Sequence, residues 1–297
     1  MNSDRRRYRV VHRTDYHYGA TMIDGYSVAH LLPRGTPSQV VHASRVASEP
    51  HGDEVDESTD AFGNHVLQLG IHQPHERLAV VAECEVDVRS QELPRRATSW
   101  ERVAAHISGL RGALVADVLP FTASSRFVAV DEHRKLLADL AYLAFLPNRP
   151  IAEACAALST LIFERFVFDP SFTEVSTPLD EVIASGRGVC QDFAHLAVGA
   201  ARSLGLAARY VSGYIETDPP PGEPKVVGAD ASHAWCSVWI PDHGWLDIDP
   251  TNGIIAPDRH VTVGWGRDYA DVAPVRGVVI GPSSTQELTV SVDVARV

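Results

Sequence analysis

The sequence predicts an α+β protein, with an N-terminal antiparallel β-sandwich-like unit followed by a core in which helices pack on an antiparallel sheet. Residues 8 to about 90 mix β-branched and aromatic residues in alternating patterns, which are typical of half-buried strands. From residue 97 the apolar residues recur at intervals of three and four, which favours amphipathic helices. A further helical pattern and several apolar strands follow from residue 190.

The N-terminal unit is expected to span residues 1–92. Strands are predicted in YRVVHRTDYHY, HVLQLGI and LAVVAECEVDVRS, and the segment DAFGNH supplies turn residues. In the last strand Cys84 alternates with Glu83 and Glu85, so we expect its thiol to point inward as a small core residue. QELPRR, at 91–96, combines a proline with charges where both flanking patterns stop, and it is predicted to be a linker.

The second unit is expected to span residues 97–297, with its core at about 150–256 and C-terminal β segments within 257–297. Helices are predicted in WERVAAHISGLRGAL, DEHRKLLADLAYLAFL and IAEACAALSTLIFERF, the third of which packs Cys155 among alanines and leucines. Another amphipathic helix begins at Cys190 and ends near Gly205, where a C-cap glycine is favoured.

Strand patterns dominate the remainder of the second unit. AARYVSGYI predicts a strand, and the proline-rich segment DPPPGEPK, at 218–225, predicts a surface loop and a candidate lid. HAWCSVWI and GWLDID flank PDHG and predict a hairpin. Further strands are expected at 260–265, 276–280 and 288–294.

Composition excludes several classes of partner. The chain has 297 residues, 45% of them hydrophobic and 22% charged, which is ordinary for a globular protein with a sizeable core. A net charge of −12 gives no basic surface for nucleic acid or anionic lipid, so neither partner is expected. The first residues lack an apolar run long enough for a signal peptide or a membrane span, which predicts a cytoplasmic protein.

The cysteines and histidines predict neither a disulfide framework nor a metal site. The four cysteines are far apart and form no C-x-x-C pair, so reduced thiols are expected. The 14 histidines are scattered without the H-x-x-x-H or H-E-x-x-H spacing of helical zinc sites. No metal and no cofactor are therefore expected.

The stretch RGVCQDFAH places Cys190 between a glycine-bearing turn and the first turn of a helix. The unpaired N–H groups and the helix dipole at this end favour an anion, so the thiolate of Cys190 is easier to form there. Gly186 and Gly188 would allow a substrate carbonyl to approach the Cys190 N–H, a natural oxyanion donor. On this pattern alone Cys190 is either a nucleophile or a buried thiol near a helix end.

A thiol nucleophile needs a base and an orienting group. Strand alternation in DASHAWCSVWI puts His233 and Trp235 on one face and Cys236 on the other, so Cys236 is expected to be a core residue. A hairpin centred on Pro241 would set Asp249 opposite His233 on the same face. Asp249 also precedes Pro-Thr, so a strand-ending turn is the alternative role of its carboxylate.

Residues near these three have weaker assignments. Asp192 is expected to be a first-turn acid facing away from the thiol and pairing with Arg187, and His195, about 140° round the helix from Cys190, to be a packed histidine. Trp235 is equally compatible with a wall of the substrate tunnel and with the core. Candidates to line the cleft, each with a core or loop role as the alternative, are Tyr210, Tyr214 and Asp230.

The three segments GVCQDFAHLAVGAARSLGLAARYVSGY, DASHAW and GWLDIDPTNG closely resemble the bacterial branch of the transglutaminase-like superfamily. The resemblance spans about 170 to 256. YRVVHRTDYHY, LLPR, the following Gln39 and DAFGNHV are similar to the β-rich N-terminal domain of bacterial members. The resemblance implies a papain-like core that performs acyl transfer at amides.

The resemblance further implies that Cys190 is the nucleophile, His233 the base and Asp249 the orienting carboxylate. It implies a thioester with release of ammonia or an amine, resolved by an amine or by water. The sequence departs from animal transglutaminases in lacking a tryptophan between Trp100 and Cys190, in having Val189 and Gln191 where those enzymes have Gln and Trp, and in lacking a calcium-binding loop. Candidate substrate-binding residues are Gly188, Gln191, Trp235 and Tyr214.

The leading hypothesis is a cysteine acyltransferase or amidohydrolase acting on peptide or protein amides, with an amine as a second substrate where transfer occurs. A cysteine peptidase would use the same triad and differ in whether water or an amine resolves the thioester. A non-catalytic peptide-binding module is the alternative from another class.

Overall fold

The computed structural model describes residues 5–172, 177–218, 232–256, 258–282 and 285–297, and it is a mixed α/β structure with antiparallel sheets. Its helices are α1 (Trp100–Ser108), α2 (Leu114–Val118), η1 (Leu119–Thr122), α3 (Val130–Ala141), α4 (Ile151–Arg165), α5 (Leu179–Ser185), α6 (Cys190–Ser203) and η2 (Tyr269–Asp271). Its strands are β1 (Arg5–Met22), β2 (Asp24–Ala29), β3 (Gln39–Glu49), β4 (Glu54–Thr59), β5 (His65–Ile71), β6 (His75–Arg89), β7 (Val167–Phe168), β8 (Arg187–Gly188), β9 (Ala208–Ile215), β10 (Ser232–Ile240), β11 (Gly244–Asp249), β12 (Ile254–Ile255), β13 (His260–Gly266), β14 (Val275–Ile280) and β15 (Gln286–Arg296).

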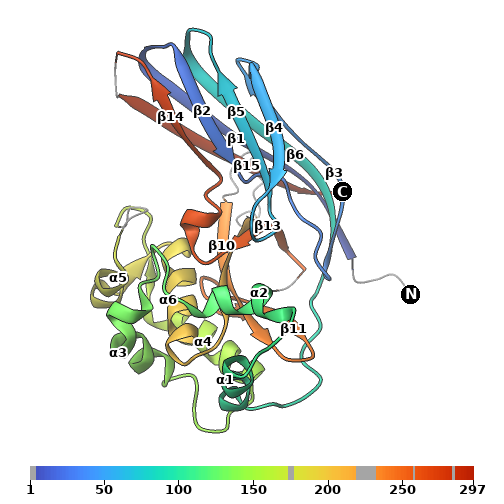
Figure 1. The fold of residues 1–297 in the computed structure, drawn as a ribbon, viewed down its shortest axis with the longest axis vertical. Helices are drawn as coiled ribbons and strands as arrows, with labels where there is room; N and C mark the ends of the chain where they lie inside the picture. The colour runs from blue at the N-terminus through green and yellow to red at the C-terminus, as the bar shows by residue number, and fades with distance from the viewer. Residues whose placement is uncertain (1–4, 173–176, 219–231, 257, 283–284) are drawn as a thin grey trace.

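Two antiparallel four-stranded sheets contain the N-terminal strands, in the orders β15-β1-β6-β3 and β14-β2-β5-β4. Residues of both sheets, among them Leu69 and Ile71 of one and Leu78 and Val80 of the other, share one apolar cluster. The two sheets form the upper part of the molecule in Figure 1, above the helices.

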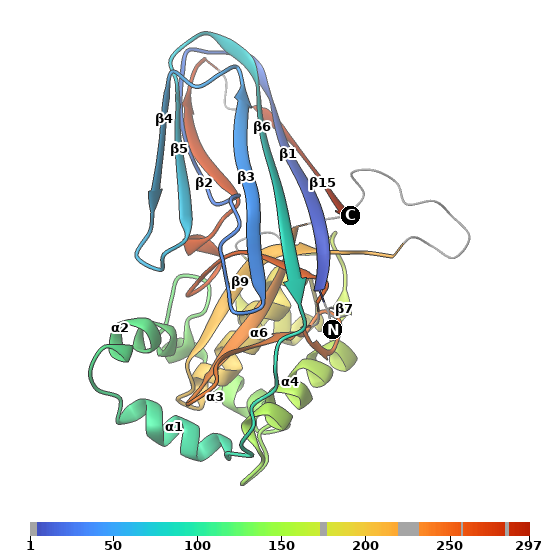
Figure 2. The ribbon, with the colours of Figure 1, turned by 90° about the vertical axis from the view of Figure 1, so that its right-hand side faces the viewer.

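The sequence analysis grouped the C-terminal strands within 257–297 with the second unit. The last two of these strands instead belong to the sheets of the N-terminal region. β14 pairs with β2 and β15 pairs with β1, so both complete the sheets of the N-terminal region. Figure 2 shows β15 beside β1 along the length of that region. A local sequence pattern predicts only that a segment forms a strand. The neighbour of that strand depends on which sheet edge has unpaired backbone groups, and this is not a local property.

A five-stranded sheet in the order β12-β11-β10-β9-β13 forms the centre of the second region. Helix α6 packs on β9 and β10, while α4 packs against β11 and β12. The alternate residues Ala234, Cys236 and Val238 of β10 are buried in the same apolar cluster as the inner residues of these helices. Cys236 and Cys155 are both fully enclosed there, as the alternation and the helical pattern predict.

Side-chain amides of the N-terminal region fasten it to the central sheet. Gln39 donates from Nε2 to the Thr262 carbonyl at 2.7 Å and accepts from the Thr262 N–H at 2.9 Å. Asn64 does the same with Trp265, at 2.8 and 3.0 Å, and Gln91 with Asp247, at 2.7 and 2.9 Å. Each amide takes the place of a neighbouring strand's peptide group, so it satisfies backbone groups at the sheet edges.

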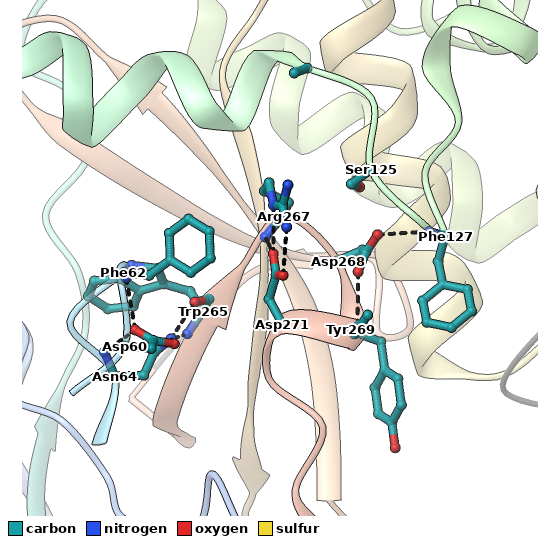
Figure 3. A network of polar contacts seen from close by, with 12 residues as sticks. Asp60, Phe62, Asn64, Ser125, Phe127, Trp265, Arg267, Asp268, Tyr269 and Asp271 are labelled. Carbon is teal, nitrogen blue, oxygen red and sulfur yellow. Dashed lines mark hydrogen bonds and ion pairs between the residues drawn. The ribbon is translucent and has the colours of Figure 1, made fainter. Parts of the chain in front are cut away.

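Figure 3 shows this junction around Asn64, Asp60 and Trp265, and the adjoining contact of Asp268 with Phe127. Asp268 Oδ2 accepts the Phe127 N–H at 2.7 Å. The enclosed guanidinium of Arg202, on α6, donates to the carbonyls of Ala208 and Arg267 at 2.9 and 2.7 Å. The end of α6 is thereby fixed to the start of β9 and to the segment that follows β13.

In the part of the chain that is described, no helix has the length and apolar character needed to cross a membrane. The cytoplasmic location stays a prediction.

Candidate active site

Cys190 is the first residue of α6, as the sequence predicts. Val189 precedes the helix in an extended conformation, and the Asp192 carboxylate accepts the Val189 N–H at 2.8 Å. Asp192 is therefore a capping acid, and it is enclosed rather than facing solvent. Cys190 is half-buried, whereas Cys84, Cys155 and Cys236 are buried.

The hairpin of β10 and β11 carries the other two predicted residues, in a register that differs from the expected one. Ser237 pairs with Asp247, and Cys236 with Ile248. Continuing this register sets Asp249 level with Trp235 and diagonal to His233, because the turn is centred on Asp242 rather than on Pro241. The expectation of a directly opposite pair was wrong, but a shift by two residues keeps both side chains on one face.

The three predicted residues meet at His233. The ring Nε2 of His233 lies 2.9 Å from Oδ2 of Asp249. The Cys190 side chain also acts on the His233 ring and contributes to raising its pKa. Because Asp249 occupies Nε2, Nδ1 is the ring nitrogen left for the sulfur. The His233 side chain is 8% exposed and that of Asp249 is fully enclosed.

The electrostatics favour a charged ring beside an ionised carboxylate. Burial by itself would lower the pKa of His233, but hydrogen bonds with Asp249 and Cys190 and the attraction of both groups raise that pKa from 6.5 to about 10. Burial would likewise raise the pKa of Asp249, but the hydrogen bonds from His233 and His260 hold it well below its usual value. The pair therefore stays ionised at neutral pH.

His260, at the start of β13, is a site residue that the sequence analysis missed. Its Nε2 lies 2.8 Å from the same Oδ2 of Asp249, and its Nδ1 has no partner among the described residues. Asp249 also accepts the N–H groups of Thr251 and Asn252 and, at 2.6 Å, the Asn252 side-chain amide. The available signal was a histidine beginning the apolar run HVTVGW, 11 residues after Asp249.

His233, Asp249 and His260 also form the one grouping of potential metal ligands found in the described ranges, with ligand atoms within 4.8 Å of one another. Each histidine nitrogen is at hydrogen-bond distance, 2.8 or 2.9 Å, from one carboxylate oxygen. Ligand atoms about 2.0–2.1 Å from a tetrahedral zinc would be farther apart than this. The geometry is that of a hydrogen-bonded chain.

The predicted substrate-binding residues have different surroundings. Gly188 is buried, and a Cβ there would lie 2.9 Å from Asp192, so its small size serves the packing of the first turn of α6. Gln191 is half-buried on that turn. Trp235 is enclosed, with its ring edge-on to His260 at 5.1 Å and 6.1 Å from His233, so it supports the histidines.

The two tyrosines are enclosed. Tyr214 packs with Val261 and N-terminal valines, and its ring lies 5.6 Å from His12, which places it in the contact between the two regions. Tyr210 lies against His195, whose Nε2 accepts the Tyr269 N–H at 3.1 Å. His195 is thus a packed histidine, and burial lowers its pKa to about 4. Arg187 lies 3.7 Å from Asp169. Asp230 and most of the 218–225 loop lie outside the described residues.

Comparison with protein families assigns both regions. Residues 145–250 match the transglutaminase-like superfamily, and residues 8–87 match the bacterial transglutaminase-like N-terminal region. The chain belongs to the transglutaminase-like superfamily.

Similar curated proteins come from mycobacteria. The uncharacterized protein Rv2569c of Mycobacterium tuberculosis is 39% identical over 97% of this chain and 92% of its own length. The uncharacterized protein ML0607 of Mycobacterium leprae is 31% identical over 98% of this chain and 99% of its own. A protein-glutamine gamma-glutamyltransferase of Pseudomonas aeruginosa is 32% identical over 35% of this chain and 16% of its own length.

Among solved structures, a protein of Cytophaga hutchinsonii described as a candidate cysteine protease has the same fold. The match has a TM-score of 0.77 with 21% identity and covers 99% of this chain and 91% of that chain.

Proposed function

We propose that this protein is a thiol-dependent enzyme that cleaves or exchanges peptide or protein amides through a Cys190–His233–Asp249 triad. The observation that supports this most directly is that an enclosed carboxylate lies 2.9 Å from one imidazole, while the thiol at a helix N-terminus contributes to raising the pKa of the same imidazole. A nucleophile, a base and an orienting group in hydrogen-bond contact are what nucleophilic catalysis at a carbonyl requires.

In the proposed resting state the proton of the Cys190 thiol already lies on His233, so that a thiolate stands beside the charged ring. In the proposed reaction this sulfur attacks the carbonyl carbon of the amide. The tetrahedral intermediate collapses as the carbon–nitrogen bond breaks, and His233 returns the proton to the departing ammonia or amine. The acyl group remains on Cys190 as a thioester. An incoming amine, or water, then gives its proton to His233 and displaces the sulfur.

Asp249 holds the imidazole in one orientation and stabilises its charged form. Because the raised pKa of His233 depends on this carboxylate, the ring is held protonated beside the sulfur. His260 donates to the same carboxylate oxygen, so we propose that it fixes the position of Asp249 rather than contacting the substrate.

The first turn of α6 supplies the proposed stabilisation of the oxyanion. The N–H groups at the start of a helix have no intrahelical acceptors, and the helix dipole favours a negative charge there. The Cys190 N–H is the proposed oxyanion donor. Val189 and Gln191 replace the residues of animal transglutaminases, so strict glutamine crosslinking is not part of the proposal.

The proposed substrate class, a peptide or protein amide, is supported by the superfamily and by the glutamyltransferase relative. A cysteine peptidase with the same triad remains the second candidate, because the related fold includes a candidate cysteine protease. For the N-terminal region, we propose the sandwich-like arrangement predicted from the sequence, since its two sheets share an apolar cluster.

The test is a screen of peptide amide donors with and without an added primary amine. Ammonia release and amine incorporation are measured in parallel for the wild type and for Cys190→Ala, which removes the nucleophile and little else. We expect turnover by the wild type, a thioester adduct on Cys190, and at least a thousandfold loss in the variant. Equal turnover by Cys190→Ala would refute the proposal, and incorporation of the amine would separate transferase from peptidase.

A further inference from the structure

A cavity of about 740 Å³ lies between the N-terminal region and the central sheet. Its lining includes Arg34 and Phe62 from the first region, Phe121 from η1, and Arg209, Trp245 and Trp265 from β9, β11 and β13. None of the triad residues lines it. In Figure 1, β11, β13 and α2 lie below the N-terminal sheets.

Two arginines and two tryptophans of the cavity form a stack. The guanidinium carbon of Arg34 lies 3.5 Å from the centroid of the Trp265 ring, and that of Arg209 lies 3.6 Å from it. Both cannot occupy one face at these distances, so they sandwich the ring. Arg209 also lies 4.2 Å from Trp245. Stacking holds the Arg209 guanidinium in a fixed plane without using its N–H groups.

Arg209 has no hydrogen-bond or ion-pair partner in the part of the chain that the structure describes. Its residue is 7% exposed, and its Nε is enclosed and unpaired. Burial lowers its pKa to about 9, against a partial opposing attraction from Asp247. Arg34, in contrast, donates to the Phe62 carbonyl and to Asn64 Oδ1, both at 2.8 Å. A buried cation without a partner is costly unless something else supplies the negative charge.

The sheet row that carries Arg209 has two further unpaired polar atoms. Arg209 and Asp247 both pair with Ser237 in the strand register, so the three residues lie in one row across β9, β10 and β11. Arg209 Nε, Ser237 Oγ and Asp247 Oδ1 all lack partners in the described ranges. Polar groups without protein partners beside a cavity are typical of a ligand-binding site.

The other lining residues indicate the chemistry of the ligand. Phe62, Phe121 and Trp239 give an apolar wall, while the acidic residues Glu92, Asp117 and Asp247 balance the lining arginines Arg34, Arg89 and Arg209. Because the net charge of these six residues is near zero, a multiply charged phosphate is disfavoured. Arg209, whose Nε is unpaired, can still bind a single carboxylate, and the apolar wall suits an apolar body attached to it.

We propose that this cavity binds a small monocarboxylate with an apolar or aromatic body, such as an N-acylated aromatic amino acid or a peptide C-terminus, with its carboxylate on Arg209. A planar guanidinium held between two rings presents its free N–H edge to a carboxylate, and the two groups match in geometry. The site is separate from the triad and does not depend on the activity proposed above.

The test titrates the full-length protein with N-acetylphenylalanine and, as the matched control, with N-acetylphenylalaninamide, which lacks the charge. Binding is followed by calorimetry and by tryptophan fluorescence, since three of the five tryptophans line the cavity. We expect the carboxylate to bind at least tenfold more tightly than the amide. Equal affinities, no binding of either compound, or tighter binding of inorganic phosphate would overturn the assignment.

Variants locate the site. Arg209→Met keeps the length and stacking volume of the side chain but removes the charge, and we expect about a 10- to 100-fold loss of affinity with a melting temperature at least as high as that of the wild type. Ala116→Trp, at an exposed lining position on α2, should block access while leaving Arg209 in place. Arg134→Met, on the exposed side of α3, is the control that keeps wild-type binding. If Ala116→Trp or a folded Arg209→Met binds as the wild type does, the inference is wrong.

Discussion

Replacing Asp249 by Asn tests whether this carboxylate keeps His233 charged. Asn has nearly the same size, but its amide cannot hold a cation, and it offers donors where the His233 and His260 nitrogens and the Asn252 amide already point. Removing one partner of a buried charged pair costs about 3–5 kcal/mol. We expect a loss of this size in the free energy of unfolding near pH 6.

The pH dependence of that loss is more specific. A pKa raised from 6.5 to about 10 corresponds to roughly 5 kcal/mol, an attraction that also lowers the pKa of Asp249 and is counted once. The stabilisation from His233 is fully present below its unfolded pKa near 6.5 and is lost as the pH rises through the folded value. The stabilisation from Asp249 is present above the pKa of this carboxyl in the unfolded chain. It is lost only as the pH falls through the lowered pKa of the folded state. Between pH 6.5 and 8.5 the wild-type pair should therefore lose up to about 2.7 kcal/mol.

The measurement is urea unfolding of Cys190→Ala with and without Asp249→Asn, at pH 6.5 and 8.5. The Cys190→Ala background removes the thiol beside His233, and with it part of the cause of the raised pKa of that ring. The difference between the two proteins should shrink by about 1–2.5 kcal/mol over this range. Asp139→Asn, at an exposed ion pair with Lys135, should show almost no change. A difference of constant size for Asp249→Asn would show that the carboxylate does not hold the ring protonated.

Three further outcomes are expected. Iodoacetamide should label half-buried Cys190 first, because burial raises the pKa of Cys84 and of Cys155 to about 12 and that of Cys236 as well, and equal labelling rates by mass spectrometry would contradict this. His260→Phe retains an aromatic ring against Trp235 but removes the hydrogen bond to Asp249. The kcat of this variant should therefore fall about 10- to 100-fold, with an altered pH profile and little change in KM. An unchanged pH profile would exclude a positioning role for His260. Gly188→Ala would bring a Cβ to 2.9 Å from Asp192, so the start of α6 should shift. We expect the free energy of unfolding, measured by thermal unfolding, to fall by about 1–3 kcal/mol and turnover to be reduced. A fully active variant of wild-type stability would show that the turn tolerates a side chain.

Local patterns in the sequence were enough to find the elements that carry the candidate site. Cys190 begins a helix because a glycine-bearing turn precedes an apolar stripe, and His233 and Asp249 share a face because their separation is even. Parity survives a shift of register by two residues, which is why the pair was predicted although the hairpin turn was misplaced.

Long-range pairing could not be obtained in this way. His260 reaches Asp249 only because β13 joins the sheet beside β9, and no local pattern encodes that neighbour. Tyr214 was a candidate to line the cleft with a core role as the alternative, and its side of β9 faces the N-terminal sheets. The partners of β14 and β15 depend on strands near the opposite end of the chain.

The pairing of β15 with β1 joins Tyr8 to Arg296. During synthesis on the ribosome, the first strands emerge long before the segment that completes their sheets, so they wait with open edges while the helical region is made. Closing such a long loop is also slow in refolding. The sheet that contains β1 is therefore completed only when β15 has been made, and loss of β15 would leave the edge of β1 open to intermolecular strand pairing.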